Sequence, residues 1–331
     1  MKEKKGIYQF IIGLMILGIA FILSITVGRY HISIEDFGKI LLGRQVDATI
    51  KMVFFHLRLP RTIMVILGGM GLGIAGSIYQ MIFKNPLATP DIMGVSSGAN
   101  LGAAIAIIFF TGGSFVLGFT AFLGGLLAVF TAIGLTNLSR DKGISSIVLA
   151  GIVITSMAQG IIMMLKYFAD PERQLAAIEF WSMGSFAGIT LDKLLAVLPF
   201  FILGIIILFL LRWQINILSL SDDEGRSLGV NVTVIRTFAI IGSTLVVASI
   251  VSVTGLITFI GLMAPHIGRI IRKKNDFNTG IFSGIIGAII LIIADSLARS
   301  ISSSEIPISI LTTFIGAPYL AYLIVTQDRR L

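Results

Sequence analysis

The ionisable residue that lies deepest in an apolar stretch of this 331-residue chain is Asp295, and Arg299 follows it four positions later. That spacing puts the two side chains on one face of a helix, where they can form a local ion pair. A carboxylate inside an apolar span can instead serve a coupling ion in a secondary transporter, because charge buried in a membrane is costly and usually functional. Both interpretations of Asp295 stay open on the sequence.

No group of residues has the spacing of an enzyme site. The chain has no cysteine, and its three histidines, His31, His56 and His266, are far apart in sequence, so neither a thiolate site nor a catalytic metal centre is expected. Ser96 and Ser97 have no evident His or Lys partner. The motifs G-x-S-x-G, H-E-x-x-H and the phosphate loop G-x-x-x-x-G-K-[ST] are all missing. We therefore expect a chain that is not an enzyme, binds no cofactor and does not hydrolyse ATP itself.

The elements that must position Asp295 are membrane spans. Apolar residues make up 56% of the chain and charged residues 13%, against about 25% charged residues in a soluble domain. The mean hydropathy is +0.98. The net charge of +8 is interpreted as a sign of membrane orientation, because Lys and Arg collect at cytoplasmic ends. A nucleic-acid partner is not expected.

Apolar runs separated by charged or turn-rich breaks predict an all-α, polytopic membrane protein of about ten transmembrane helices with short surface helices. One helical span needs about 20 apolar residues. The predicted spans are residues 7–28, 59–82, 93–110, 115–137, 146–168, 191–211, 236–254, 256–271, 279–298 and 307–325. The whole chain, residues 1–331, is expected to form a single transmembrane domain.

Three compact basic clusters orient the predicted spans. They lie at residues 140–142, 269–275 and 328–331, and all three fall on one side of the topology. The positive-inside rule makes that side cytoplasmic. Because the number of spans is even, both termini are expected in the cytoplasm.

Two long segments expected outside the membrane predict short surface helices. In residues 29–57 apolar residues recur at helical spacing, namely Ile34, Phe37, Ile40 and Leu41. In residues 169–190, Asp170 and Pro171 suit the N-cap and the first position of a helix.

A third long segment, residues 212–235, is expected inside and predicts two short polar helices. Ser221 precedes three consecutive acids, which suits an N-cap followed by negative charge in the first turn. Gly225 weakens that helix, and Gly229 is suited to ending it.

Glycine and proline indicate where helices approach closely and where they stop. Small residues four apart let two backbones come together, as in the pairs Gly69/Gly73, Gly98/Gly102 and Gly280/Gly284. Pro86 and Pro90 stop helix propagation between the second and third spans. Irregular backbone near membrane depth is allowed only against protein or a water-filled cavity. Residues 83–102 are therefore interpreted either as a wall of an inner gate or as a plain turn between helices.

Five motifs, in order along the chain, carry a resemblance to a known family. They are "LRLPR" at residues 57–61, the stretch from "GLGIAGS" to "GANLGA" at 71–103, "SLGV" at 227–230, "GLITFIGLMAPHIGR" at 255–269 and "SEIPISILTTFIGAPYL" at 304–320. Together they resemble the FecCD-type permease subunits of the ABC importers for iron siderophores, haem and vitamin B12. The resemblance runs over nearly the whole chain.

The resemblance implies a function and a set of partners. It implies a permease subunit that forms the translocation pathway of an ATP-driven importer in the bacterial inner (cytoplasmic) membrane. The implied substrate is an iron chelate, a ferric siderophore first and haem or cobalamin as alternatives. The implied partners are a second permease subunit (a copy or a paralogue), two ABC ATPase subunits that bind ATP and Mg, and an extracytoplasmic binding protein.

The resemblance also implies sites at both faces of the membrane. Arg58, Arg61 and Arg299 match outer-face arginines that pair with glutamates of the binding protein. Interfacial snorkelling is the alternative for the first two, and the pair with Asp295 for the third. The cytoplasmic loop 212–235 matches the helices that couple to the ATPase, with a solvated loop as the alternative. Its expected contact residues are Asp222, Glu224, Arg226, Leu228 and Gly229.

Further residues are expected along the pathway. Asn85 and Leu87 match one cytoplasmic gate, and Ile144 and Ser145, in the loop before span 146–168, match another. Lining residues inferred from the face of that span are Ser156, Gln159 and Met163, although packing against lipid or core is the alternative for Met163. The competing class is an ion-coupled secondary transporter, which would need no ATPase and would place a carboxylate near mid-membrane.

Overall fold

The computed structural model describes residues 2–28, 30, 32–140, 143–301 and 305–327, and every regular element in these ranges is a helix. The long helices are α1 (Lys2–Thr26), α4 (Leu59–Ile82), α5 (Val95–Phe109), α6 (Gly113–Leu138), α7 (Ile144–Phe168), α9 (Leu191–Leu210), α12 (Val232–Thr254), α13 (Ile260–Arg272), α14 (Phe277–Ser300) and α15 (Ile308–Gln327). The short ones are α2 (Ile34–Leu41), α3 (Ala48–Met52), η1 (Val53–Arg58), η2 (Pro90–Met93), η3 (Pro171–Leu175), α8 (Ala176–Ser182), α10 (Arg212–Leu218) and α11 (Asp222–Ser227). The predicted all-α class is confirmed. Three parts of the sequence analysis lie outside the described residues. They are residues 141–142 of the first basic cluster, the whole cluster 328–331, and residue 304 at the start of the last family motif.

Within the described ranges, seven helical stretches are long and apolar enough to cross a membrane. They are Gly6–Thr26, Ala48–Ile82, Gly113–Leu138, Ile144–Phe168, Leu191–Leu210, Val232–Thr254 and Phe277–Ser300. The predicted spans 93–110 and 307–325 coincide with shorter apolar helices, and 256–271 coincides with α13, which has 13 residues. Thirteen residues reach about 20 Å, less than the roughly 30 Å of a hydrocarbon core. Every predicted span is thus a helix, while the count of ten spans stays a prediction.

Helix α4 forms the centre of the bundle, with α14, α13 and α12 packed against it. Almost every residue of α4 from Met64 to Ile82 is buried. The close approach depends on the predicted glycines, because a Cβ at Gly69 would strike the backbone of Ala288 and one at Gly73 would strike the carbonyl of Ser283. The tight packing expected from these small residues is confirmed.

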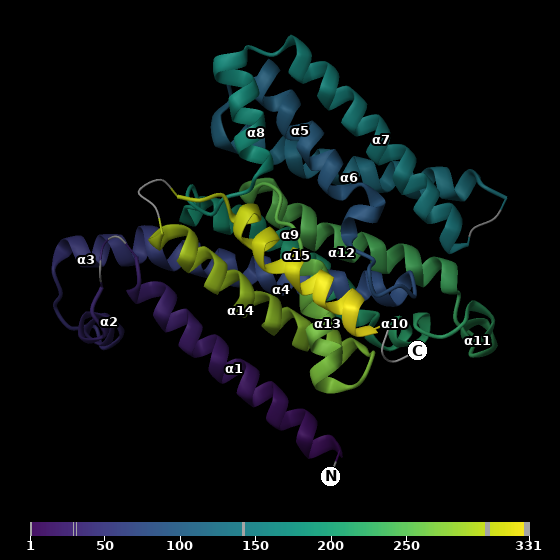
Figure 1. The fold of residues 1–331 in the computed structure, drawn as a ribbon, viewed down its shortest axis with the longest axis horizontal. Coiled ribbons are helices and arrows are strands. Elements are labelled where there is room, and N and C mark those ends of the chain that lie inside the picture. The colour runs from purple at the N-terminus through teal and green to yellow at the C-terminus, as the bar shows by residue number, and fades with distance from the viewer. Residues whose placement is uncertain (1, 29, 31, 141–142, 302–304, 328–331) are drawn as a thin grey trace.

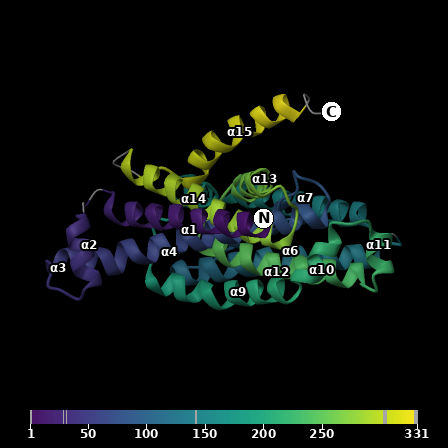
Figure 2. The same cartoon turned by 90° about the horizontal axis from the view of Figure 1, so that it is seen from below.

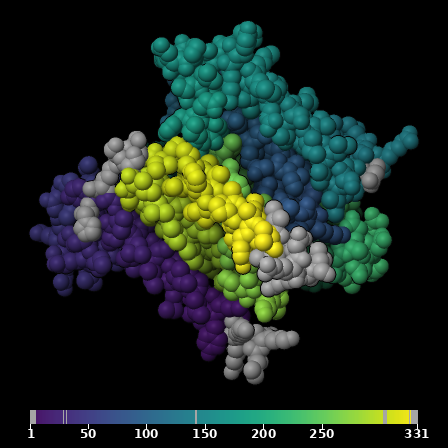
Figure 3. Space-filling view, in the orientation of Figure 1, coloured from purple at the N-terminus to yellow at the C-terminus, as the bar shows by residue number. Residues whose placement is uncertain are grey.

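A second group of helices, α5 to α8, lies beside this centre at the top of Figure 1. Within it α5 and α6 touch backbone to backbone, since a Cβ at Gly98 would strike Gly124 and one at Gly102 would strike Thr120. Helix α7 packs on α5, α6 and η2 and leaves most of its surface uncovered. Helices α5 and α6 of this group pack on α12. In the space-filling view the α7 and α8 part of the group projects at the top, and α15 lies across the front of the molecule (Figure 3).

The two surface helices predicted from apolar spacing in 29–57 and from Asp170 and Pro171 in 169–190 are both present. The Ser33 side chain accepts from the Asp36 amide at the start of α2, and Phe37 packs on Phe54. The Asp170 side chain accepts from the amides of the first turn of η3, which continues into α8.

Helix α10 differs from its prediction as a polar helix. Ile215, Ile217 and Leu218 are buried because α10 packs against α12, α4 and α14. That prediction was wrong for α10, whereas α11 is polar. The predicted loop before span 146–168 is also shorter than expected, because α7 already begins at Ile144.

The long helices run between two ends of the molecule. The end that holds α2, α3 and the start of α4 is called here the arginine end, and the end that holds α10 and α11 is called the α11 end. Helix α4 has 24 residues and so spans about 36 Å between them. Figure 1 shows α2 and α3 at one side and α11 at the other, and Figure 2 shows α15 projecting from the layer of the remaining helices.

Candidate functional site

The arginine end contains a buried network of ion pairs between α4 and α14. Arg61 donates from Nε and Nη2 to Oδ1 of Asp295 at 3.1 and 2.8 Å, and from Nη1 to Glu305 at 2.8 Å. Arg299 lies one turn after Asp295, with its Nε 3.1 Å from Oδ2 of that carboxylate. One carboxylate therefore serves two guanidinium groups.

Arg58 and the remaining donors of Arg299 hold the end of α1 in place. Arg58 donates to the carbonyl oxygens of Val27 at 2.7 Å and Tyr30 at 3.2 Å. Arg299 donates to the carbonyl and hydroxyl oxygens of Ser24 at 3.1 and 3.0 Å. Charge-assisted hydrogen bonds to backbone carbonyls are strong, so they fix α1 against the end of η1, which leads into α4, and against the end of α14.

The same side chains surround a cavity of about 230 Å³. Its lining residues are Tyr30, Val53, Leu57, Arg58, Arg61, Ala187, Ile189, Arg299 and Glu305. All three arginines are buried, at 5 to 8% exposure, and two carboxylates accompany them. The cavity therefore carries an excess of positive charge in a site of low dielectric, where an incoming carboxylate is attracted strongly.

The structure brings together the three arginines that the sequence grouped. Arg299 pairs with Asp295 and also lines the cavity, so the predicted pair is observed, while its role in docking stays a prediction. Sequence reasoning missed Glu305 and missed that Arg61, 234 positions away, shares Asp295. A carboxylate between two predicted spans, at the end where the arginines were expected, was the signal for Glu305.

The α11 end contains a helix held by its own cap. The Ser221 hydroxyl accepts from the Glu224 amide at 3.2 Å, and the Glu224 carboxylate accepts from the Ser221 amide at 2.9 Å. These bonds from the Ser221 amide and hydroxyl keep the pKa of Glu224 below its usual value. Gly229, with φ +78°, follows the last turn, in the left-handed conformation that glycine adopts without strain.

Asp222 ties α11 to two other parts of the chain. Its carboxylate accepts from Lys84, just after α4, at 2.9 Å and from Arg236, in α12, at 2.9 Å to each oxygen. Partial burial alone would raise the pKa of Asp222, but the hydrogen bonds from Lys84 and Arg236 outweigh it and lower that pKa. The sequence assigned Asp222 to an outward contact, whereas its carboxylate is engaged within the chain.

The outward surface of this segment is formed by other residues. Asp223 and Arg226 have side chains that are 95% and 67% exposed, and Leu228 is 56% exposed. An apolar residue surrounded by exposed charges, on a capped and therefore rigid helix, has the form of a docking knob.

The predicted gate residues lie at the α11 end as well. Asn85 and Leu87 are exposed, and the Asn85 side chain accepts from the Leu87 amide at 2.9 Å, which stabilises the turn after α4. Ile144 and Ser145 are the first two residues of α7. Their roles in a gate stay predictions.

The predicted lining residues Ser156, Gln159 and Met163 share one exposed face of α7. Their spacing of three and four positions places them along one side of the helix. Nothing in the described chain covers that face, so their role in the pathway stays a prediction.

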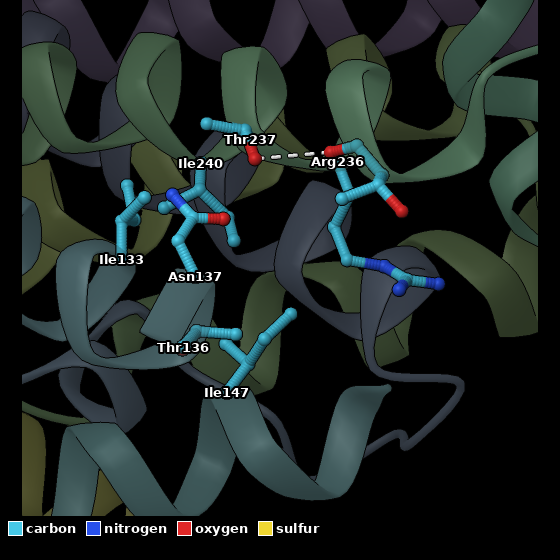
Figure 4. Close-up of a pocket in the computed structure, with 8 residues that line it drawn as sticks. Ile133, Thr136, Asn137, Ile147, Arg236, Thr237 and Ile240 are labelled. Atoms are coloured by element: carbon cyan, nitrogen blue, oxygen red, sulfur yellow. Dashed lines mark hydrogen bonds between the residues drawn. The ribbon is translucent and has the colours of Figure 1, made fainter. Parts of the chain in front are cut away.

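A small cavity lies between α6, α7 and α12, beside Arg236 (Figure 4). In Figure 4 the Asn137 side chain points toward α12, whereas the Arg236 side chain extends away from the cavity. Its volume is about 20 Å³, which holds about one water molecule. This cavity is too small for a chelate.

A helical bundle with several apolar spans, and with charged sites at opposite ends of its central helix, has the form of a polytopic membrane protein. The model of the FecCD transport family matches residues 16–326, and the chain belongs to that family. It is thus an ABC importer permease of the FecCD type.

Several relatives align along the whole chain. The Fe(3+)-citrate import system permease protein YfmE of Bacillus subtilis is 36% identical over 99% of this chain and 98% of its own length. The molybdate import system permease protein MolB of Haemophilus influenzae is 34% identical over 95% and 94%. A solved structure described as an inward-facing conformation of a metal-chelate type ABC transporter has a TM-score of 0.85 and 34% identity, covering 95% of this chain and 97% of that one.

Proposed function

We propose that this chain forms the translocation pathway of a bacterial ATP-driven importer for an iron chelate, with a ferric siderophore as the first candidate and haem or cobalamin as alternatives. The observation that carries the proposal is the presence of two charged sites at opposite ends of α4, one cationic and buried and the other polar and exposed. An importer needs two such surfaces, because substrate arrives on one side while ATP is hydrolysed on the other.

The arginine end is the proposed outer face, where a binding protein docks. Arg58, Arg61 and Arg299 line a cavity with excess positive charge, which suits carboxylates of a delivering protein. Pairs between Arg and carboxylate orient a partner and still dissociate.

The α11 end is the proposed cytoplasmic face, where the ATPase binds. Glu224 and Gly229 shape the helix and its end, while Arg226 and Leu228 offer the contact surface. Asp222 fixes the helix to the turn that carries Asn85 and Leu87, so movement of α11 would reach the proposed gate. The pathway itself would run along the exposed face of α7, between this chain and a second permease subunit.

Two substrate classes are supported by relatives. The Fe(3+)-citrate permease favours an iron chelate, and the molybdate permease favours an oxyanion as the second candidate. An ion-coupled secondary transporter has less support, because the buried carboxylate Asp295 is neutralised by Arg61 and Arg299.

The test is uptake into proteoliposomes that hold the permease with its co-purified ATPase and binding protein. Radiolabelled iron, as ferric siderophore or ferric citrate, is expected to enter only with ATP inside and binding protein outside. Uptake of molybdate instead would select the second candidate. Uptake driven by an ion gradient without ATP would refute the importer.

Two variants test the proposed outer face and the proposed cytoplasmic face independently. Arg58→Gln is expected to weaken binding-protein docking about ten-fold while basal ATP hydrolysis stays unchanged, since a hydrogen bond to a charged group contributes about 1.5–3 kcal/mol. Leu228→Asp is expected to abolish uptake and ATPase binding. The matched control is Leu138→Asp, which alters an even more exposed leucine at the end of α6, 85% exposed against 56% for Leu228. Equal loss in both leucine variants would contradict the coupling role.

A further inference from the structure

A basic corner lies at the α11 end, where α13 ends against α1 and α14. It consists of Arg269, Arg272, Lys273 and Lys274. Gln9 of α1 donates from Nε2 to the Ile271 carbonyl at 2.9 Å, which holds the two helices together at this point. Helix α14 packs against both α1 and α13, and Figure 1 shows the end of α13 near the lower parts of these two helices. Neither the arginine-end cavity nor α11 includes any of these residues.

The Arg272 guanidinium is held between two aromatic rings. Its Cζ lies 4.8 Å from the centre of the Phe10 ring and 5.9 Å from that of Phe282. The two rings themselves meet edge to face at 5.4 Å. Such cation–π contacts orient a guanidinium without neutralising its charge.

The depth of Arg272 in the bundle corresponds to the edge of a membrane. Phe10 lies in the first turns of the span Gly6–Thr26, and Phe282 in the second turn of the span Phe277–Ser300. The guanidinium therefore sits where both apolar spans begin. Lipid phosphates lie at this level, between the hydrocarbon core and water.

The charge of the basic corner is not balanced within the described part of the chain. Nε and Nη1 of Arg272 and Nη2 of Arg269 are buried there without a hydrogen-bond partner, and the described ion pairs include no member of the corner. The nearby carboxylate of Asp276 instead accepts from the amide and hydroxyl of Thr279, each at 2.7 Å. Buried cationic groups without acceptors are unfavourable unless an anion approaches them.

The surface next to the corner is suited to acyl chains. Helix α1 exposes Ile7, Tyr8, Ile11 and Ile12 at 47 to 63%, and most of its apolar span is uncovered by the rest of the molecule. A tyrosine at the first turn of a span is typical of the membrane boundary. A cationic head site thus continues directly into an apolar strip.

We propose that the basic corner binds the phosphate of an anionic phospholipid, whose acyl chains lie along the exposed face of α1. The phosphate oxygens accept from Lys273 and Lys274, which are exposed, and lie beside the guanidinium of Arg272, whose charge they balance. Basic pockets between transmembrane helices recognise anionic head groups in this way. The bound lipid supplies the negative charge that the described chain lacks here and fastens α1 to α13 and α14. The proposal does not depend on which substrate the permease carries.

The experiment is native mass spectrometry of the purified permease complex in detergent, titrated with dioleoyl phosphatidylglycerol or dioleoyl phosphatidylcholine. The wild type is expected to bind phosphatidylglycerol at least five-fold more tightly than phosphatidylcholine. Arg272→Gln is expected to lower that affinity about five-fold, the effect of one basic residue near a charged lipid surface, and to leave phosphatidylcholine unchanged. If this variant fails to fold, Lys273→Gln combined with Lys274→Gln takes its place, with an expected loss of about 30-fold because two basic residues are removed.

The matched control is Arg212→Gln. Arg212 also stacks on a phenylalanine at the α11 end, with Cζ 4.7 Å from the Phe209 ring, but no second ring encloses it. Affinity for phosphatidylglycerol that is unchanged in Arg272→Gln, or lowered equally in Arg212→Gln, would overturn the proposal. Displacement of the lipid by inorganic phosphate at equal concentration would also overturn it, because the site would then bind a free anion rather than a lipid.

Discussion

The arginine network and the α11 segment stabilise opposite ends of the same central helix by different means. At the arginine end, Arg61 and Arg299 share the carboxylate of Asp295, whose side chain is 1% exposed. At the α11 end, Asp222 joins Lys84 and Arg236, but its side chain is 32% exposed. Solvent screens the second set of ion pairs and hardly reaches the first. We therefore expect the loss of an acid to destabilise the fold more at the arginine end than at the α11 end.

The largest expected effect follows from removing the shared acid. Asp295→Asn leaves two buried guanidinium groups with one carboxylate, and breaking a buried ion pair in this way costs about 3–5 kcal/mol. Thermal unfolding of the purified permease in detergent measures the loss. Asp223→Asn, at an exposed acid of α11, is the control, and a change as small as in that control would contradict the buried network.

A smaller effect is expected from the corresponding acid at the α11 end. Asp222→Asn leaves Arg236, whose side chain is 3% exposed, without its carboxylate. Because Asp222 itself is partly exposed and screened, we expect a loss of about 1–2 kcal/mol. The same unfolding assay applies. A loss equal to that of Asp295→Asn would remove the distinction between the two ends.

A still smaller effect, confined to α11, is expected from removing the cap of that helix. Ser221→Ala removes the hydroxyl that accepts from the Glu224 amide, which costs about 1 kcal/mol of helix stability. Hydrogen exchange of the α11 amides is expected to accelerate about five-fold, while exchange at α4 and α14 stays unchanged. Ser227→Ala, at the other end of α11, is the control. Faster exchange in α14 would show that the cap acts beyond its own helix.

Local patterns predicted the fold better than the site. Apolar runs located all ten long helices, and the acids after Ser221 located α11, because spans and caps depend on neighbours in sequence. The polar prediction for α10 failed since Ile215 and Ile217 are covered by helices that are distant in sequence.

The partners of the charged residues could not be predicted from local spacing. The three arginines were grouped by a resemblance between motifs, whereas the pairs of Arg61 with Asp295 and of Asp222 with Lys84 join residues 234 and 138 positions apart. Such pairs depend on how helices pack. The i,i+4 spacing predicted the pair of Asp295 with Arg299, but it gave no sign of the second guanidinium group, that of Arg61.

The smallest effect is expected from lowering the pH, which should loosen the α11 end. The pKa of Asp222 and the pKa of Glu224 are both lowered in the folded chain, so their contribution to α11 is present above the unfolded values, about 3.9 and 4.3, and is lost as pH falls through the lower folded values. The chain has no cysteine, so a spin label on Arg226→Cys reports α11 alone. Its mobility is expected to stay constant from neutral pH down to about pH 5 and to rise below about pH 4. In Asp222→Asn the label should already be more mobile at neutral pH, because the ties to Lys84 and Arg236 are gone. A label whose mobility rises between neutral pH and about pH 5 would show that groups other than these two carboxylates hold α11.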